Sequence, residues 1–153
     1  MAFVTASPTP RHCVDEAIAR LRAAKFRATT PEPGSKSAGF AARDGSLIAW
    51  RTSKKAGPTR VITAHTDSPN LRIKPRPDTV SAGAHQLGVE VYGGALVNSW
   101  LDRDLGLAGQ VITRPKKKGT DVASHLISTI GLCYASLSWR FTSIGRSRPR
   151  VYC

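Results

Sequence analysis

The sequence predicts an α/β fold, because one amphipathic helix pattern near the N-terminus is followed by several short strand patterns. The chain has 153 residues, which is enough for about one domain, and its apolar fraction of 41% permits a hydrophobic core. No run of about 18 apolar residues is present, so we expect no membrane partner.

The helix is expected over residues 13–25, after an extended stretch from Phe3 to Pro10. A proline restricts the residue before it to extended conformations, and both Pro8 and Pro10 lie in this stretch. The helix is predicted by five apolar residues at helical spacing, which are Val14, Ala17, Ile18, Leu21 and Ala24.

Strand patterns follow the helix. The first begins after the turn signal Asp44-Gly45, and the second is rich in β-branched residues. We expect these two strands to be antiparallel and to form part of an α/β sheet. The five predicted strands cover residues 46–51, 60–64, 71–74, 86–92 and 105–113.

The net charge of +13 is the strongest compositional signal, and taken alone it suggests a small basic nucleic-acid-binding protein. The charge is unevenly distributed, however. Residues 114–153 contain 8 Lys or Arg against 1 acidic residue, whereas residues 1–113 contain 15 against 9. Residues 1–113 show no basic surface interleaved with aromatic residues, so nucleic acid binding stays the alternative and we expect no nucleic acid partner.

The cysteines and the N-terminus bear on the cellular compartment. Cys13, Cys133 and Cys153 are odd in number and form no CxxC pair, so we expect free thiols. The first ten residues lack the basic start of a signal peptide. We therefore expect a cytoplasmic protein.

His65 and Asp67 form the sharpest candidate site, at the end of the strand predicted over residues 60–64. Residues two apart on an extended chain point to the same face. A histidine that ligates a metal commonly needs an anionic neighbour to fix its tautomer. The spacing alone is also compatible with a surface histidine beside an aspartate.

Four segments resemble the aspartyl aminopeptidase family of zinc metallopeptidases, in the order found in that family. FVTASPTPRHCV resembles the family's N-terminus, and GSLIAWR resembles the strand before the metal-binding one. VITAHTDSPNLRIKP, residues 61–75, looks like the metal-binding segment. QLGVEVYGGALVNSWLDRDLGLAGQVI, residues 86–112, resembles the start of the dimerisation domain.

This resemblance implies an aminopeptidase that releases N-terminal Asp or Glu from peptides. It implies His65 as a ligand of one zinc in a two-zinc site, and Asp67 as the catalytic carboxylate that orients this histidine. It also implies a homo-oligomer. Residues 1–70 would be the incomplete N-terminal part of an αβα catalytic domain, and residues 71–127 the start of a β-rich dimerisation domain.

The rest of the implied metal site is missing, since its further ligands lie far downstream in the family and the sequence contains no Glu-Glu pair. We therefore expect this chain to be inactive, or to be a non-catalytic fragment that docks on an intact homologue through residues 88–112. The other histidines are His12, His85 and His125, and the cluster Asp102-Arg103-Asp104 is expected to be a turn held by salt bridges.

The last part of the chain, residues 128–153, shows neither a helical nor a strand period, and we expect it to be a disordered, out-of-frame tail. When each codon from Gly131 to Gly145 is begun one nucleotide earlier, permitted third bases give RPLLRVPQLAIHLDR. This peptide resembles the family segment RPLLRIPxLAIHLDR at every position. A frameshift would also explain the late positive charge without a polyanion partner.

Overall fold

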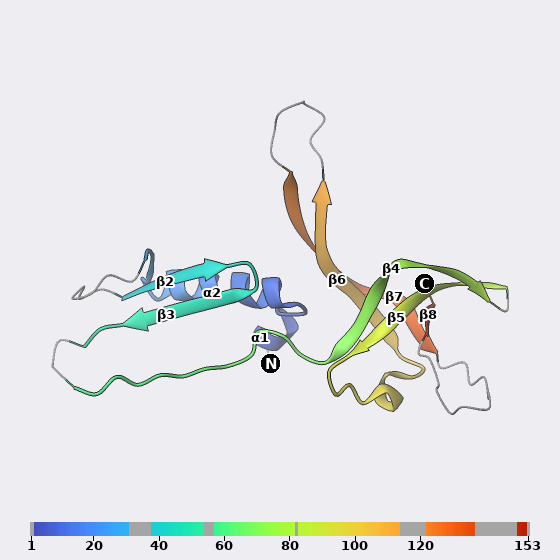
Figure 1. Ribbon diagram of the computed structural model, residues 1–153, viewed down its shortest axis with the longest axis horizontal. Coiled ribbons are helices and arrows are strands. Elements are labelled where there is room, and N and C mark those ends of the chain that lie inside the picture. The colour runs from blue at the N-terminus through green and yellow to red at the C-terminus, as the bar shows by residue number, and fades with distance from the viewer. Residues whose placement is uncertain are drawn as a thin grey trace. The chain divides into compact units, whose positions relative to one another are not determined.

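The computed structural model describes residues 2–30, 38–53, 57–81, 83–113, 122–136 and 150–152. The chain divides into two compact units, Met1–Asp67 and Ser68–Cys153. The first unit combines helices with a three-stranded sheet, and the second contains a five-stranded sheet (Figure 1). The predicted α/β class is therefore confirmed.

The extended stretch predicted at the N-terminus is wrong at its start, where helix α1 spans Ala2–Thr5. Its single turn is closed by the Ala6 N–H, which donates to the Ala2 carbonyl at 3.1 Å. A proline restricts only the residue directly before it. Pro8 therefore leaves the earlier residues free to form a turn.

Helix α2 spans Pro10–Ala23 and confirms the predicted helix, although it begins before residue 13. Thr9 is its N-cap, with an extended backbone (φ −137°, ψ 163°) and a hydroxyl that accepts from the His12 N–H at 3.4 Å. Pro10 suits the first position, because its missing N–H would have no partner there. The buried face of the helix includes Val14, whose side chain is 3% exposed.

The sheet of the first unit has the order β1-β2-β3, with β1 at Arg27–Ala28, β2 at Ala38–Arg43 and β3 at Ser46–Arg51. The short strand β1 runs parallel to β2, and β2 pairs antiparallel with β3 through the predicted Asp-Gly turn. Strand β3 confirms the prediction over residues 46–51. Its described partner is β2, and not residues 60–64 as expected.

Gly39 on β2 leaves room for the indole ring of Trp50, which is its register partner on β3. A Cβ atom at Gly39 would lie 2.6 Å from Trp50 Cζ2 and 2.8 Å from Thr29 Cγ2. We expect Gly39→Ala to lower the free energy of unfolding by about 1–3 kcal/mol, because the indole ring must shift to admit the methyl group. Urea denaturation of the 153-residue chain measures this.

Gly57→Ala is the matched control for that substitution, because a Cβ at Gly57 meets nothing within 4 Å. We expect it to change the free energy of unfolding by less than about 1 kcal/mol. Equal losses in the two variants would contradict the steric explanation for Gly39.

The second unit is a five-stranded sheet in the order β4-β5-β8-β7-β6, and all neighbouring strands are antiparallel. Strands β4, β5 and β6 confirm the patterns predicted at residues 71–74, 86–92 and 105–113. The elements are β4 (Asn70–Ser81), β5 (Ala84–Tyr92), the 3-10 helix η1 (Val97–Trp100), β6 (Asp104–Thr113), β7 (Ala123–Ser136) and β8 (Arg150–Tyr152).

Val89 is the centre of the small core in this second unit and is 5% exposed. Three partly buried leucines pack against it, and they come from three different strands, β4, β5 and β6: Leu71, Leu87 and Leu105. The core therefore joins the first hairpin of the unit to strand β6.

The last described residues differ from the expectation of a disordered tail, because residues 128–136 belong to β7 and Arg150–Tyr152 form β8. An antiparallel ladder is held by backbone groups, so it can continue through a segment without side-chain periodicity. Residues 137–149 and the basic run Lys116–Lys118 lie outside the described residues. None of the described helices combines the length and apolar character needed to cross a membrane.

Candidate functional site

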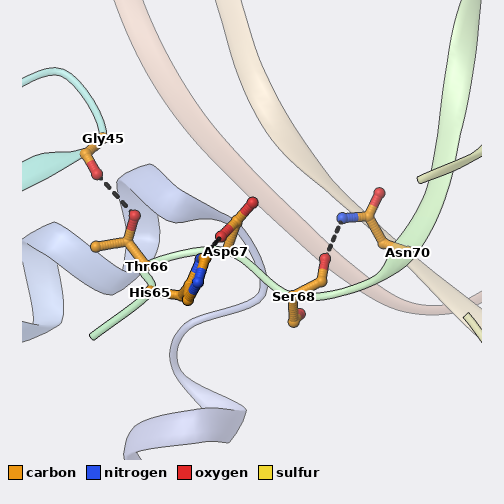
Figure 2. Close-up of polar contacts among 6 residues, drawn as sticks. All are labelled: Gly45, His65, Thr66, Asp67, Ser68 and Asn70. Atoms are coloured by element: carbon orange, nitrogen blue, oxygen red, sulfur yellow. Dashed lines mark hydrogen bonds and ion pairs between the residues drawn. The ribbon is translucent and has the colours of Figure 1, made fainter. Parts of the chain in front are cut away.

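The segment that carries the predicted site is anchored to the first unit by Thr66. Its hydroxyl donates to the carbonyl of Gly45 at 2.8 Å, and Gly45 lies in the turn between β2 and β3 (Figure 2). A Cβ at Gly45 would lie only 3.0 Å from Pro10 Cβ at the start of α2. Because Gly45 has no side chain, the turn can lie close to the start of α2. The carbonyl of Gly45 then accepts the hydrogen bond from Thr66.

His65 and Asp67 flank this anchor and contact each other. The His65 Nδ1–H donates to Asp67 Oδ1 at 3.1 Å, with the two side chains lying side by side in Figure 2. Side chains on an extended chain alternate between faces. The Thr66 hydroxyl contacts Gly45, while its two neighbours contact each other.

The two side chains of the pair differ in exposure. His65 is 92% exposed, whereas the side chain of Asp67 is 26% exposed. With Nδ1 donating to the carboxylate, the lone pair of the imidazole lies on Nε2, which is the arrangement of a histidine that binds a metal through Nε2. A hydrogen bond at Nδ1 also restricts rotation of the ring.

The donor chemistry of the pair fits one zinc ligand and its orienting carboxylate, because imidazole nitrogen is a usual ligand for zinc. A closed zinc site needs four ligands. Among the side chains that the structure describes, no three His, Cys, Asp or Glu residues are grouped closely enough to hold a metal ion. The described side chains therefore do not by themselves form a closed zinc site.

The strand predicted over residues 60–64 is wrong for the described structure, in which residues 57–65 form neither helix nor strand. Val61 and Ile62 are 78% and 95% exposed. A β-strand requires backbone hydrogen bonds to a neighbouring strand. No described strand pairs with this segment, so its β-branched composition predicts an extended backbone but not a sheet.

The other three histidines lie in secondary structure. His12 Nδ1 and Thr9 Oγ1 are 2.7 Å apart at the start of α2, which makes His12 part of the helix cap. On β7, His125 Nε2 lies 3.3 Å from Thr113 Oγ1 of β6. His85 lies on β5 opposite Val80.

The charged cluster at residues 102–104 leads from a turn at Leu101 and Asp102 into β6, which begins at Asp104. Asp102 adopts a left-handed backbone conformation with φ 56°. Among the ion pairs between described residues, none involves this cluster, so the predicted salt bridges are wrong. Asp tolerates positive φ better than most residues, which is sufficient reason for its place in the turn.

Comparison with known proteins places the chain in a protein family. The family model of the aminopeptidase I zinc metalloproteases (M18) matches residues 3–130. The chain belongs to this family. Its members are aminopeptidases, which are hydrolases, and the name of the family specifies zinc. The match includes both residues of the His65–Asp67 pair.

Curated relatives carry the same family name. An M18 family aminopeptidase 2 of Streptomyces coelicolor is 46% identical over 152 residues, with 86% of this chain and 35% of the relative covered. A protein of the same name in Mycobacterium leprae is 40% identical over 131 residues, with 82% and 31% covered. The chain therefore spans about a third of the length of these relatives.

Solved structures support the fold. The chain matches Ape4 in a cryo-EM structure of the Ape4 and Nbr1 complex with a TM-score of 0.78 and 30% identity, covering 99% of this chain and 32% of that one. It matches Chaetomium thermophilum mApe1 with a TM-score of 0.76 and 27% identity, covering 99% and 38%. A dodecamer of S. cerevesiae mApe1 matches with a TM-score of 0.69 and 27% identity, covering 87% and 33%.

Sequence reasoning missed Thr66 as the residue that positions the pair. The signal available was a threonine between His65 and Asp67, whose hydroxyl can donate to a backbone carbonyl. The partner of that hydroxyl is a backbone carbonyl 21 residues earlier, and no local pattern identifies it.

Proposed function

We propose that this chain supplies the first metal-binding segment of a zinc aminopeptidase, with His65 as a zinc ligand and Asp67 as the carboxylate that orients it. The observation that carries the proposal is the 3.1 Å hydrogen bond from His65 Nδ1 to Asp67, made by an imidazole that is 92% exposed. The family match over residues 3–130 supports the same reaction class.

The proposed substrate is a peptide with an N-terminal Asp or Glu, which the resemblance of residues 61–75 implies. Two zinc ions in one site polarise the scissile carbonyl and activate water. His65 would contribute one imidazole nitrogen to that site. Asp67 would keep the ring in one tautomer and one orientation, with Thr66 holding the backbone between them.

The 153-residue chain by itself is expected to show no aminopeptidase activity and no stoichiometric zinc. The reason is that a single imidazole with its carboxylate is less than the ligand set of a closed zinc site. The measurement is hydrolysis of a peptide with N-terminal Asp, in the presence of added zinc, together with the zinc content of the purified protein.

His65→Ala of the same chain is the control for this measurement, since it removes the proposed ligand. Activity in the wild-type chain above that of His65→Ala would overturn the expected inactivity. Such activity would show that the remaining ligands are supplied from another source, for example a second subunit.

We also propose that the gene is out of frame from about residue 128. The family match ends at residue 130, directly before the segment Gly131–Gly145 whose alternative reading resembles the family. This coincidence supports the frameshift and needs no assumption about the structure of the tail. Restoring the frame would then extend the resemblance beyond residue 130.

The proposed assembly is a homo-oligomer, and the proposed compartment is the cytoplasm. The dodecamer of the S. cerevesiae relative supports assembly of the family from identical subunits. The second unit, which begins at Ser68, would carry the dimerisation function that its resemblance implies.

A further inference from the structure

The turn between β2 and β3 contains an aspartate followed directly by a glycine, Asp44-Gly45. The register of the two strands ends at the pair Arg43↔Ser46, so both turn residues lie beyond the ladder. The Asp44 side chain is 69% exposed, which leaves its carboxylate open to water. The turn therefore places a solvated carboxylate beside a backbone amide that the strand pairing does not hold.

Two features of this turn favour attack of the Gly45 backbone nitrogen on the side-chain carbonyl carbon, Cγ, of Asp44. Glycine has no Cβ, so no side chain shields the attacking nitrogen. Asp44 has a left-handed backbone conformation with φ 53°, which is energetically costly for a residue with a side chain. A reaction that moves the backbone link from the α-carbonyl to the side chain releases Asp44 from this conformation.

We propose that Asp44 is a site of isomerisation to isoaspartate, and that its ion pair with Arg11 slows the reaction. In the first step the Gly45 nitrogen bonds to Cγ of Asp44 and loses its proton. The carboxyl oxygen leaves with that proton as water, and a succinimide ring forms.

The second step is addition of one water to a carbonyl of the ring. If the bond between the Gly45 nitrogen and the α-carbonyl carbon breaks, the chain stays linked through Cγ and isoaspartate results. If the bond between that nitrogen and Cγ breaks, aspartate is restored. The reaction consumes the water that it releases, and it needs no oxidant, zinc or peptide, so it stands apart from the proposed peptidase activity.

Arg11 holds the group that must react. Its guanidinium donates to Asp44 Oδ1 at 2.9 Å, from the first turn of α2. A carboxylate engaged in this way has to leave its partner before Cγ can turn toward the Gly45 nitrogen. The ion pair is exposed, so its protective effect is expected to be modest.

Isomerisation would change the contacts that the turn makes within the first unit. The link through Cβ and Cγ adds one backbone atom to a turn whose length sets the pairing of the flanking strands. Gly45 also accepts the hydrogen bond from Thr66 at 2.8 Å (Figure 2), and its Cα side lies close to Pro10. We expect the lengthened turn to loosen the β2–β3 hairpin and to displace the carbonyl that holds Thr66.

Asp102 is an internal comparison for the role of glycine. Like Asp44, it is exposed and has a left-handed backbone conformation, with φ 56°. It is followed by Arg103, whose side chain shields the backbone nitrogen that would attack. Asp102 should therefore stay unmodified while Asp44 converts.

The test is incubation of the full 153-residue chain at neutral pH, with isoaspartate measured at each aspartate over time. Liquid chromatography separates the isomeric peptides, and electron-transfer fragmentation locates the altered residue. We expect isoaspartate to accumulate at Asp44. No conversion at Asp44, or conversion at Asp102 at the same rate, would overturn the proposal.

Arg11→Gln tests the protective ion pair. Removing an exposed ion pair is expected to raise the rate of conversion at Asp44 about two- to fivefold. Arg20→Gln is the matched control, because it makes the same change on α2 at an arginine paired with Glu16 at 2.8 Å. It should leave the rate unchanged. An unchanged rate in Arg11→Gln, or an equal rise in Arg20→Gln, would contradict protection by Arg11.

Asp44→Asn tests the route through the ring, since its side chain releases ammonia in place of water and cannot form the ion pair. Freshly prepared Asp44→Asn begins unmodified, and we expect it to give the same succinimide and isoaspartate faster than the wild-type chain. Slower conversion would overturn the proposed route.

Hydrogen exchange measures the effect on the hairpin. After the two forms are separated by chromatography, the isoaspartate form should exchange the amides of Ala38–Arg43 and Ser46–Arg51 faster than the unmodified form. Equal exchange in the two forms would contradict loosening of the turn.

Discussion

Replacing His65 by alanine is expected to abolish peptide hydrolysis in the frame-restored protein, because the substitution removes a zinc ligand. The imidazole is 92% exposed, so its loss leaves no cavity in the described structure and should not impair folding. Hydrolysis of a peptide with N-terminal Asp and the zinc content per subunit measure the effect. Undiminished hydrolysis in His65→Ala would remove this residue from the metal site.

The same protein tests the role of Asp67. We expect Asp67→Asn to reduce activity or zinc affinity by roughly 10–100-fold, since the amide keeps the shape of the carboxylate but loses its charge. Asp44→Asn is the matched control. Asp44 is an exposed carboxylate paired with Arg11 at 2.9 Å, and asparagine tolerates its φ of 53°. Equal losses of activity in the two variants would contradict an orienting role for Asp67.

If the gene is out of frame as we propose, restoring the reading frame is expected to give an active peptidase, whereas the 153-residue chain is expected to be inactive. One nucleotide inserted after the codon of residue 130 shifts translation into the frame that encodes RPLLRVPQLAIHLDR across Gly131–Gly145. The continuation should then encode the remaining ligands, including a bridging Asp and a Glu pair. Expression of the edited gene, followed by the peptide and zinc assays, measures the change.

The unedited gene also tests this proposal, because the alternative reading requires particular bases. The codon of Phe141 must end in C, so that the following bases of Thr142 complete a histidine codon. The codon of Ser138 must begin with AG, so that a preceding C gives glutamine. A TTT codon for Phe141 would give tyrosine in place of the histidine of RPLLRIPxLAIHLDR and would contradict the proposed frameshift.

The secondary structure could be predicted where a local pattern was supported by its neighbours. The apolar spacing around Val14 located α2, and the alternation around Val89 located β5. The prediction for residues 60–64 used the same kind of signal and was wrong. Side-chain pattern indicates an extended backbone, but a strand also needs a partner with free backbone groups, and that partner is distant in the sequence.

In the candidate site, too, only the short-range contact could be expected from the sequence. His65 and Asp67 are two residues apart, so they lie close together along the chain, and the structure shows a hydrogen bond of 3.1 Å between them. The hydrogen bond that anchors Thr66 to Gly45 depends on where the β2–β3 turn lies relative to the segment. A local pattern contains no information about such a distance.

The sequence by itself therefore determined the α/β class, helix α2, strands β3, β5 and β6, and the pairing of His65 with Asp67. Each of these features depends on residues that are close together in the sequence, within a few turns of a helix or a few residues of a strand. Only the tertiary structure decided that β2 is the partner of β3, that Thr66 is held by the Gly45 carbonyl, and that β8 lies between β5 and β7 in the described sheet. These features depend on which segments meet in space, because sheet order and register are set by contacts between residues far apart along the chain.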